Sequence, residues 1–267
     1  MSITWPVPAT SQVAKPLLKR SITRDANVLI SGASMFCVDD IRKKRYGQGG
    51  GKIYDDIQDT NEIISVIKGN PGRAVDNLIL SQDPAKVKTA LIVGPLIYGQ
   101  GQGPVNTRSV QVEEIARVTL ETRHPFRLGA GLSTWSNIHV QDVASLVGLL
   151  TEAAIAHKTG LWNEDGIYLP ENGKMSFGEI CEAVGNEAAS RGYIPTDASV
   201  EEIDGEKADT LTSHGALLWG TNAKLHASRA KRLLNWDPVG PSLGDEIPGI
   251  VHREAIRLGI GSLGCSM

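Results

Sequence analysis

The sequence predicts an α/β protein built around a parallel sheet. Two mainly aliphatic runs, at 27–30 and 89–93, lack the polar alternation of a half-exposed strand, which is typical of strands buried on both faces. A helical pattern lies between them, with Val75, Leu78 and Ile79 at helical spacing. A strand, a helix and a second strand in this order form a βαβ unit, whose strands are expected to lie parallel.

Length and composition narrow the class of protein further. The chain has 267 residues, 41% of them hydrophobic and 21% charged, which is ordinary for a soluble globular protein with a sizeable core. A net charge of -3 gives no basic surface for nucleic acid or an anionic membrane. The three cysteines are far apart, so neither a disulfide framework nor a metal site is indicated and a reducing, cytoplasmic compartment fits best. No stretch approaches the roughly 18 apolar residues of a membrane span.

The amino-terminal third contains the first strand and a long polar segment. Residues 13–20 favour a short helix, and the strand at 27–30 runs into the small residues Ser31 to Ser34. Such an ending either delivers hydroxyl groups to a site at the strand tip or is simply a turn, and both interpretations remain open. Residues 39–59 are polar and are expected to form a solvated loop.

Two glycine-rich runs do not indicate a phosphate site. A phosphate loop needs Ser or Thr after its lysine, whereas Lys52 is followed by Ile53, and no strand precedes Gly47. A G-x-G-x-x-G run at 259–264 leaves no room for the helix that would lie under a pyrophosphate. Both runs are therefore interpreted as loops.

The stretch 88–142 is the segment around which the rest is expected to fold. The loop after its strand has glycines at alternate positions: Gly99, Gly101 and Gly103. Loops of this kind at the carboxyl end of a parallel strand are where α/β proteins bind ligands. A helix is predicted over 109–120 and a short strand over 135–140. Asp142 is expected to cap the apolar helix that follows, and His139 to be buried and hydrogen-bonded.

The remaining segments alternate between short strands and helices. Residues 160–173 are predicted to form a hairpin, or a strand that ends in a turn. Ser176 and Glu179 form the capping box of a helix over 177–190. Further helices are predicted over 201–218, 227–234 and 252–258.

Taken in order, these pieces resemble the extended short-chain dehydrogenase/reductase superfamily and, within it, the fungal branch described as NAD-dependent epimerase/dehydratase. The resemblance spans about residues 15–251 and is carried by VLISGAS, VKTALIVGPLIYGQGQGPVNTRSVQ, GAGLSTWSNIHVQDVASLVGLL, YLPENGKMSFGEI and NAKLHASRAKRLLNWDP. It implies a partial Rossmann-like, doubly wound parallel sheet with a small carboxyl-terminal α/β portion that binds substrate. Residues 1–105 then correspond to a remnant of the NAD(P)-binding domain, and residues 106–267 to the substrate-binding portion interleaved with the last sheet elements.

The resemblance also implies a function. It implies an NAD(P)-dependent oxidoreductase or epimerase/dehydratase-like protein that acts on a small metabolite, in a fungal biosynthetic pathway, with NAD or NADP as cofactor. Charge and composition predict no nucleic acid, membrane or metal partner, and a homodimer is left open. Two alternatives remain: a cofactor-independent protein that binds or isomerises a small molecule, and a non-functional product.

The sequence departs from the superfamily in two places. Members begin with a strand, a G-x-x-G-x-x-G turn and a helix, whereas the first strand here corresponds to their fifth. The amino-terminal nucleotide-binding half is therefore expected to be missing. Members also carry a Y-x-x-x-K pair, in which the ammonium lowers the pKa of the phenol. No tyrosine of this chain has a lysine four residues later, and Arg73 and Asn77 occupy the positions of the pair.

Candidate catalytic residues follow from the resemblance. Ser31 or Ser34 takes the strand-end serine position. Arg73 is expected to act at most as an electrostatic stabiliser, because an always-charged guanidinium cannot shuttle a proton. Tyr98 is expected to face the substrate.

Candidate binding residues follow in the same way. Pro95, Leu96 and Ile97 are expected to back the nicotinamide. Four residues fall where members line the substrate cleft: Asn106, Arg108, Trp135 and Asn137. Each of the four also has a structural interpretation, as a loop cap, a surface charge, core packing and a turn residue respectively.

Overall fold

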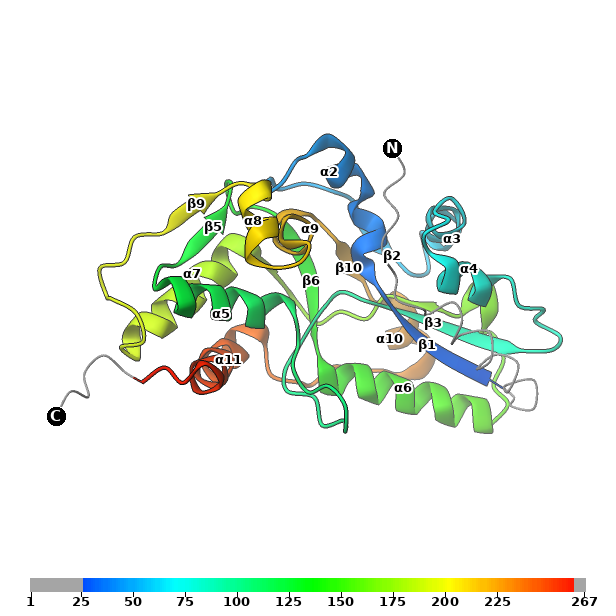
Figure 1. Cartoon of the computed structure of the whole chain (residues 1–267). Helices are drawn as coiled ribbons and strands as arrows, with labels where there is room; N and C mark the ends of the chain where they lie inside the picture. Colours follow the sequence, from blue (N-terminus) through cyan, green and yellow to red (C-terminus); the bar gives the residue numbers. More distant parts are fainter. Residues whose placement is uncertain (1–25, 262–267) are drawn as a thin grey trace.

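The computed structural model, which describes residues 26–261, places a parallel sheet between two layers of helices (Figure 1). The sheet has the order β1-β3-β7, with strands Ala26–Gly32, Lys88–Gly94 and Ile167–Tyr168. Helices α3 (Thr60–Lys68) and α4 (Ala74–Leu80) cover one face, and α6 (Val140–Ile155) covers the other. The predicted α/β fold with a doubly wound parallel sheet is confirmed, whereas the helix expected over 13–20 lies outside the described residues.

Strand β3 is buried on both faces, which explains its lack of polar alternation. Leu91 and Val93 belong to the core that contains the isoleucines of α3 and α4. Ala90 and Ile92 point the other way, into the core that contains the apolar residues of α6. Because successive side chains of a strand face opposite sides, one strand supplies both cores.

The register of β1 and β3 positions the candidate site. The two strands pair in parallel over their whole length, from Ala26 opposite Lys88 to Gly32 opposite Gly94. Both strands therefore end at the same edge of the sheet. Ser31 and Gly32 lie at this edge beside the start of the loop after Gly94.

Shorter strands form three further pairings, β2-β10, β5-β9 and β4-β6-β8. Their bounds are Ile53–Asp55 (β2), Leu96–Tyr98 (β4), Phe126–Leu128 (β5), Thr134–His139 (β6), Lys174–Ser176 (β8), Glu201–Ile203 (β9) and Lys224–His226 (β10). All of these pairs are parallel except β6 with β8. Strand β4 follows β3 after one residue and pairs with β6. These strands therefore connect the carboxyl end of β3 to the rest of the molecule.

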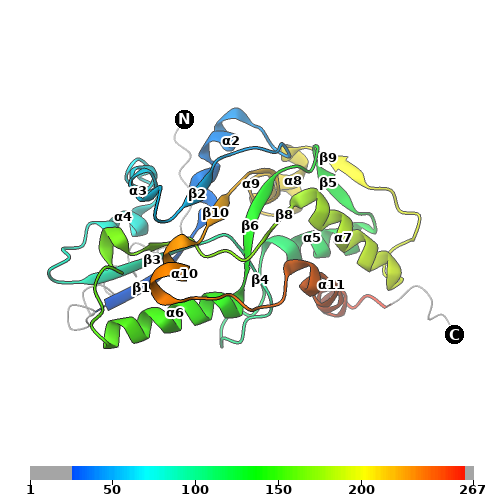
Figure 2. The same cartoon turned by 180° about the vertical axis from the view of Figure 1, so that it is seen from behind.

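A second group of helices lies away from β1 and β3. Helices α5 (Gln111–Thr122), α7 (Phe177–Ser190) and α11 (Leu243–Leu258) pack against one another at the far end of the molecule (Figure 1 and Figure 2). The short helices are η2 (Ala33–Cys37), α2 (Val38–Lys43), η3 (Asn163–Asp165), α8 (Gly205–Leu211), α9 (Gly215–Gly220) and α10 (Ser228–Leu234). Within residues 26–261, no helix is long and apolar enough to cross a membrane.

Two sequence-based predictions of secondary structure were wrong for the same reason. The segment 39–59, expected to be loop, contains part of α2 and all of β2, which pairs with β10. The helix expected over 201–218 is instead β9 followed by α8 and α9, because the residues 201–203 pair with β5. In both cases a partner far along the chain overrides the local pattern.

The start of α6 also differs from the prediction. His139 is the N-cap, and its Nδ1 accepts a hydrogen bond from the Gln141 N–H at 3.3 Å. Asp142 lies inside the first turn and accepts from the N–H groups of Val239 and Gly240 at 2.9 and 3.0 Å. It therefore anchors the chain that leads to α11. The expected capping box of α7 is confirmed, with both Ser176 and Glu179 making their hydrogen bonds.

Asp56 is a fully buried carboxylate that joins three parts of the fold. It follows β2, and its Oδ2 accepts from the Leu169 N–H at 3.0 Å, just after β7. Its Oδ1 accepts from the Arg229 N–H at 2.7 Å, in α10. The carboxylate is therefore held by N–H donors from two distant segments, and the Arg229 side chain also donates to the backbone carbonyl oxygen of Asp56 at 2.8 Å.

We expect Asp56→Asn to lower the free energy of unfolding by about 3 kcal/mol. An amide has only one acceptor oxygen, so its NH2 group must face one of the two buried N–H groups. That N–H group then has no acceptor. Urea unfolding followed by circular dichroism measures the change. Asp39→Asn is the matched control, since Asp39 is an exposed acid paired with Arg42 and Lys43, and we expect it to leave the free energy of unfolding nearly unchanged. Equal effects of the two substitutions would contradict the role given to Asp56.

Candidate functional site

A cleft of about 300 Å³ opens at the carboxyl ends of β1 and β3. Its floor includes Ser31 and Gly32 from β1 and Gly94 from β3. Its walls come from the loop after β3, the loop before α5 and the start of α6: Pro95, Ile97, Gly99, Gly101, Asn106, Thr107, Arg108, Ser109, Val110, Gln111 and Val140. The expected location of the site, where parallel strands end, agrees with this cleft.

A larger hollow of about 620 Å³ lies over α4 and is a weaker candidate. Aliphatic side chains and the ends of α3 and α4 form most of it, with Lys68 at its edge. Among the described residues that line it, there is no acid and no ion pair. The cleft at the strand ends is lined by Ser31 and by the ion-paired Arg108 and is therefore taken as the site.

Ser31, Ser34 and Arg73 come together at the floor of the cleft, with Asp76 as a fourth member. Arg73 Nη2 donates to Ser34 Oγ at 2.7 Å, and Arg73 Nη1 donates to Ser31 Oγ at 3.2 Å. Ser31 Oγ donates to Asp76 Oδ2 at 3.0 Å, and Arg73 Nη1 lies 3.4 Å from the same oxygen. The three candidates from the sequence thus form one cluster, whose positive charge is balanced by Asp76.

The cluster is layered from the cleft inward. Ser31 lines the cleft, whereas the side chains of Arg73 and Asp76 are only 17% and 5% exposed. Ser31 shares its register position with Val93, which points to the α4 face of the sheet, and α4 carries Asp76. Ser31 is thus the member of the cluster that lines the cleft, and the charged pair lies behind it.

Asn77 does not reach the cleft. Its Nδ2 donates to the carbonyl oxygens of Ile67, Asn70 and Arg73 at 3.0 to 3.1 Å. The amide therefore holds the connection between α3 and α4 in place. Arg73 is the residue before α4, and the amide fixes its backbone. It thereby fixes the direction from which the guanidinium approaches Ser31.

Two of the three loop residues that were expected to back the nicotinamide, Pro95 and Ile97, lie at the cleft, and the third, Leu96, does not. Pro95 and Ile97 line the cleft, while Leu96 is 1% exposed and packs in the core. Gly99 has a φ of +87°, and a Cβ there would lie 2.2 Å from His139 Nε2. Only glycine lets this loop turn so closely over the end of β6.

Tyr98 does not line the cleft, contrary to the expectation that it faces the substrate. Its side chain is fully buried, and its hydroxyl donates to the Pro241 carbonyl oxygen at 2.8 Å. Burial raises the pKa of Tyr98 to about 12, and the carboxylates of Asp142 and Glu246 add to the shift. The phenol is therefore neutral near pH 7 and ties the loop to the chain before α11.

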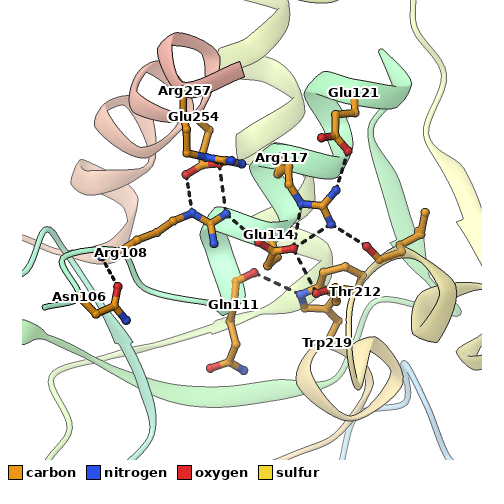
Figure 3. Close-up of polar contacts among 11 residues, drawn as sticks. Asn106, Arg108, Gln111, Glu114, Arg117, Glu121, Thr212, Trp219, Glu254 and Arg257 are labelled. Atoms are coloured by element: carbon orange, nitrogen blue, oxygen red, sulfur yellow. Dashed lines mark hydrogen bonds and ion pairs between the residues drawn. The ribbon is translucent and has the colours of Figure 1, made fainter. Parts of the chain in front are cut away.

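Arg108 and Asn106 lie at the edge of the cleft. The guanidinium of Arg108 is already paired with carboxylates (Figure 3). Arg108 Nε and Nη2 donate to the two carboxylate oxygens of Glu254 at 2.7 and 3.1 Å, and Nη2 lies 2.8 Å from Glu114. Asn106 is exposed, and its Oδ1 accepts from the Arg108 N–H at 3.1 Å. Asn106 thus shapes the loop that delivers Arg108, as a loop cap would.

The carboxylates that hold Arg108 belong to a larger charge network between α5 and α11. Glu254 also binds Arg257, and Glu114 also binds Arg117 (Figure 3). Burial acts to raise the pKa of Glu254, but hydrogen bonds from Arg108 and Arg257 outweigh it and lower the pKa. The stability that this carboxylate contributes is therefore present at neutral pH and is lost as pH falls through its folded-state pKa.

Trp135 and Asn137 lie inside the protein, away from the cleft they were expected to line. Trp135 is 4% exposed, and its Nε1 donates to Thr221 Oγ1 at 3.3 Å. Asn137 is 2% exposed and sits in the middle of β6, where its backbone bonds Gly173 and Asn172. Both residues are enclosed because β6 is a central strand with neighbours on each side.

The residues of the cleft fit the nicotinamide end of NAD(P). Gly32 leaves open space within 4 Å of where a Cβ would be, and Pro95, Ile97 and Val140 offer an apolar wall. At about 300 Å³, the cleft is at the lower end of the ligand pockets of roughly 300–1,000 Å³, a size that matches one part of a dinucleotide and not the whole. Residues 26–261 contain no strand, glycine-rich turn and helix to hold the pyrophosphate, nor a cluster of side chains that could hold a metal ion.

Asp76 and Gly32 are two site residues that the sequence did not single out. Arg73 and Asp76 are three residues apart, a spacing that brings oppositely charged side chains together at a helix start. This spacing was the available signal for Asp76. Gly32 gave no such signal, because any strand-end glycine looks the same in the sequence.

We expect Arg108→Gln to lower the free energy of unfolding at pH 7 by about 2 kcal/mol, because Glu254 and Glu114 then lose a buried charged partner. The difference from the unsubstituted protein is expected to shrink as pH falls and Glu254 becomes protonated. Thermal unfolding between pH 4 and 7 measures both. Arg42→Gln is the control, since Arg42 is an exposed ion-pair partner. A loss that stays constant with pH would contradict the pairing with Glu254.

No protein-family model matches the chain. Oxidase ucsJ from Acremonium sp is 31% identical over 265 residues, which cover 95% of this chain and 76% of that protein.

Solved structures share the fold at lower identity. Pal from Bacillus thuringiensis matches with a TM-score of 0.57 at 18% identity, over 92% of this chain and 67% of that one. UDP-glucose 4-epimerase from Thermotoga maritima matches with 0.53 at 14%, over 92% and 69%. DesIV, a dTDP-glucose 4,6-dehydratase from Streptomyces venezuelae, matches with 0.58 at 12%, over 92% and 65%. The chain thus spans about two thirds of the length of these solved proteins. At this identity and coverage the chain belongs to the same family as oxidase ucsJ, and it has the fold of the nucleotide-sugar epimerase and dehydratase structures.

Proposed function

We propose that this protein is an NAD(P)-dependent oxidoreductase that acts on a small metabolite at the cleft between β1 and β3. The observation that carries the proposal is the position of Ser31, which opens to the cleft while Arg73 and Asp76 hold it from behind. The identity to a protein named an oxidase supports redox chemistry over epimerisation. A place in a fungal biosynthetic pathway and the choice between NAD and NADP belong to the same proposal.

The residues of the cleft have distinct roles in this proposal. Bound NAD(P) supplies the hydride acceptor or donor. Ser31 forms a hydrogen bond with the substrate oxygen at the reacting carbon, and Arg73 keeps the serine in place. Pro95 and Ile97 form the apolar wall that keeps water from the nicotinamide.

A second candidate function is a cofactor-independent protein that binds or isomerises a small molecule. The observation that favours it is that residues 26–261 carry no glycine-rich fingerprint for a pyrophosphate. Nicotinamide nucleotide binding separates the two candidates, because only the first requires it.

We expect NADPH or NADH to bind saturably with a dissociation constant in the micromolar range, and Gly32→Leu to weaken binding by more than about tenfold. The backbone at Gly32 has φ −108° and ψ 144°, so leucine is accepted without strain and fills the open floor of the cleft. Titration of nucleotide fluorescence with isothermal calorimetry measures the effect for both nucleotides. Gly148→Leu adds the same side chain at an open position in the middle of α6.

The control variant is expected to bind as tightly as the unsubstituted protein and to melt at the same or a higher temperature. If neither nucleotide binds saturably, the oxidoreductase proposal is wrong and the cofactor-independent function is favoured. Equal binding by both leucine variants removes the cleft from the nucleotide site.

We expect Tyr98→Phe to lower the free energy of unfolding by about 1 kcal/mol, because the Pro241 carbonyl loses its donor. Nucleotide affinity is expected to stay unchanged, because Tyr98 lies beside the cleft and not in it. Tyr193→Phe is the control, since its hydroxyl bonds His252 at the surface. Lost nucleotide binding with unchanged stability would return Tyr98 to the cleft.

A further inference from the structure

The hydrogen bonds of Ser31 fix the direction of its hydroxyl proton. A guanidinium only donates hydrogen bonds, and an ionised carboxylate only accepts them. Arg73 therefore donates to Ser31 Oγ, and the serine proton points to Asp76 Oδ2 at 3.0 Å. One lone pair of Ser31 Oγ is left, so the serine meets a ligand as an acceptor.

Burial keeps the rest of the cluster out of reach of a ligand. Asp76 is 5% exposed at its side chain, and Arg73 is held from a second side by Ser34 at 2.7 Å. The acceptor oxygen of Ser31 is thus what this cluster presents to the cleft. A hydroxyl group satisfies an acceptor, whereas a carbonyl oxygen does not.

We propose that Asp76 acts through Ser31 as the proton acceptor for a hydroxyl group of the substrate, so that the cleft takes an alcohol. This rests on the proposed function, with NAD(P)+ as the oxidant. The substrate O–H bond breaks as its proton passes to Ser31 Oγ, and the serine proton passes to Asp76 Oδ2. The carbinol C–H bond breaks with its electron pair leaving as hydride, and the carbon–oxygen bond becomes a carbonyl. Asp76 and Arg73 are positioning residues, because Ser31 alone of the three touches the substrate.

Other ionisable groups lie near the cluster or line the same cleft. Cys37 and Asp40 follow β1, and both Asp40 and Arg73 act on the Cys37 thiol. Arg108 lies at the lip of the cleft and is paired with Glu254 and Glu114. Arg73 and Asp76 are in direct contact with Ser31 and are therefore expected to dominate its electrostatics.

A thiol at position 31 reports the charge of Asp76 without any cofactor or substrate. In Ser31→Cys, made with Cys265→Ser, the rate of alkylation by iodoacetamide is measured from pH 5 to 10. Burial raises the pKa of Cys37 and of Cys181 to about 12, so neither competes. Asp76→Asn, Arg73→Gln and the double substitution are then added to Ser31→Cys.

We expect Asp76→Asn to lower the thiol pKa by at least about one unit, because a carboxylate beside a thiolate disfavours it. Arg73→Gln is expected to raise the thiol pKa by a similar amount, and the double substitution to bring it back toward the starting value. Asp39→Asn, at an exposed acid paired with Arg42 and Lys43, is expected to leave it unchanged. Circular dichroism melts check that each variant is folded.

Two results overturn the proposal. A thiol pKa that Asp76→Asn does not move means that Asp76 is not a charged partner of position 31. A thiol that does not react at any pH means that this side chain is closed to the cleft. Both results are independent of nucleotide binding, so failure here is distinguishable from failure of the proposed function. If Asp76→Asn does not fold, the test uses Arg73→Gln and the double substitution, which removes both charges together.

Discussion

The parallel pairing of β1 with β3 is the constraint on which the candidate site depends. The two strands run in register from Ala26 and Lys88 to Gly32 and Gly94, and both faces of β3 are buried. A slip of one residue would turn every β3 side chain to the opposite face, so the register is strongly specified. Because it is specified, Ser31 faces α4 and its charged residues, while Gly32 and Gly94 form the floor of the cleft.

Charge around the cleft is paired rather than free. Arg73 is balanced by Asp76, and Arg108 by Glu254 and Glu114. An anionic ligand could bind such a guanidinium only by displacing its carboxylate partner. Leaving that buried carboxylate unpaired costs free energy, so the guanidinium gains little from the anionic ligand. The cleft therefore favours a neutral polar group over a free anion at Ser31, which agrees with an alcohol as ligand.

The sequence predicts the parts of this site that depend on local order along the chain. The strands at 27–30 and 89–93 are visible as aliphatic runs, and the serines after the first strand follow from it. The expected burial of both strands is right for β3 but wrong for β1, which is the edge strand and leaves Ile30 56% exposed. Long-range partners are not visible in the same way. Pro241 is 143 residues from Tyr98, and Glu254 is 146 residues from Arg108, so nothing near either residue indicates that its polar group is already engaged. Trp135 and Asn137 were misplaced because the neighbours that enclose β6 come from distant segments.

The chemistry of the cluster differs from that of a phenol beside an ammonium, and the difference is in which group can hold a proton. In a Tyr-Lys pair, the ammonium lowers the pKa of the phenol, so that the phenol can exchange protons near neutral pH. Arg73 keeps its proton at any accessible pH, and burial raises the pKa of Tyr98 to about 12. Among the groups in contact with Ser31, that leaves the Asp76 carboxylate as the one with a lone pair that can accept a proton. If this cleft removes a proton from its substrate, the path therefore runs through Ser31 to Asp76, and the guanidinium serves to hold both in place.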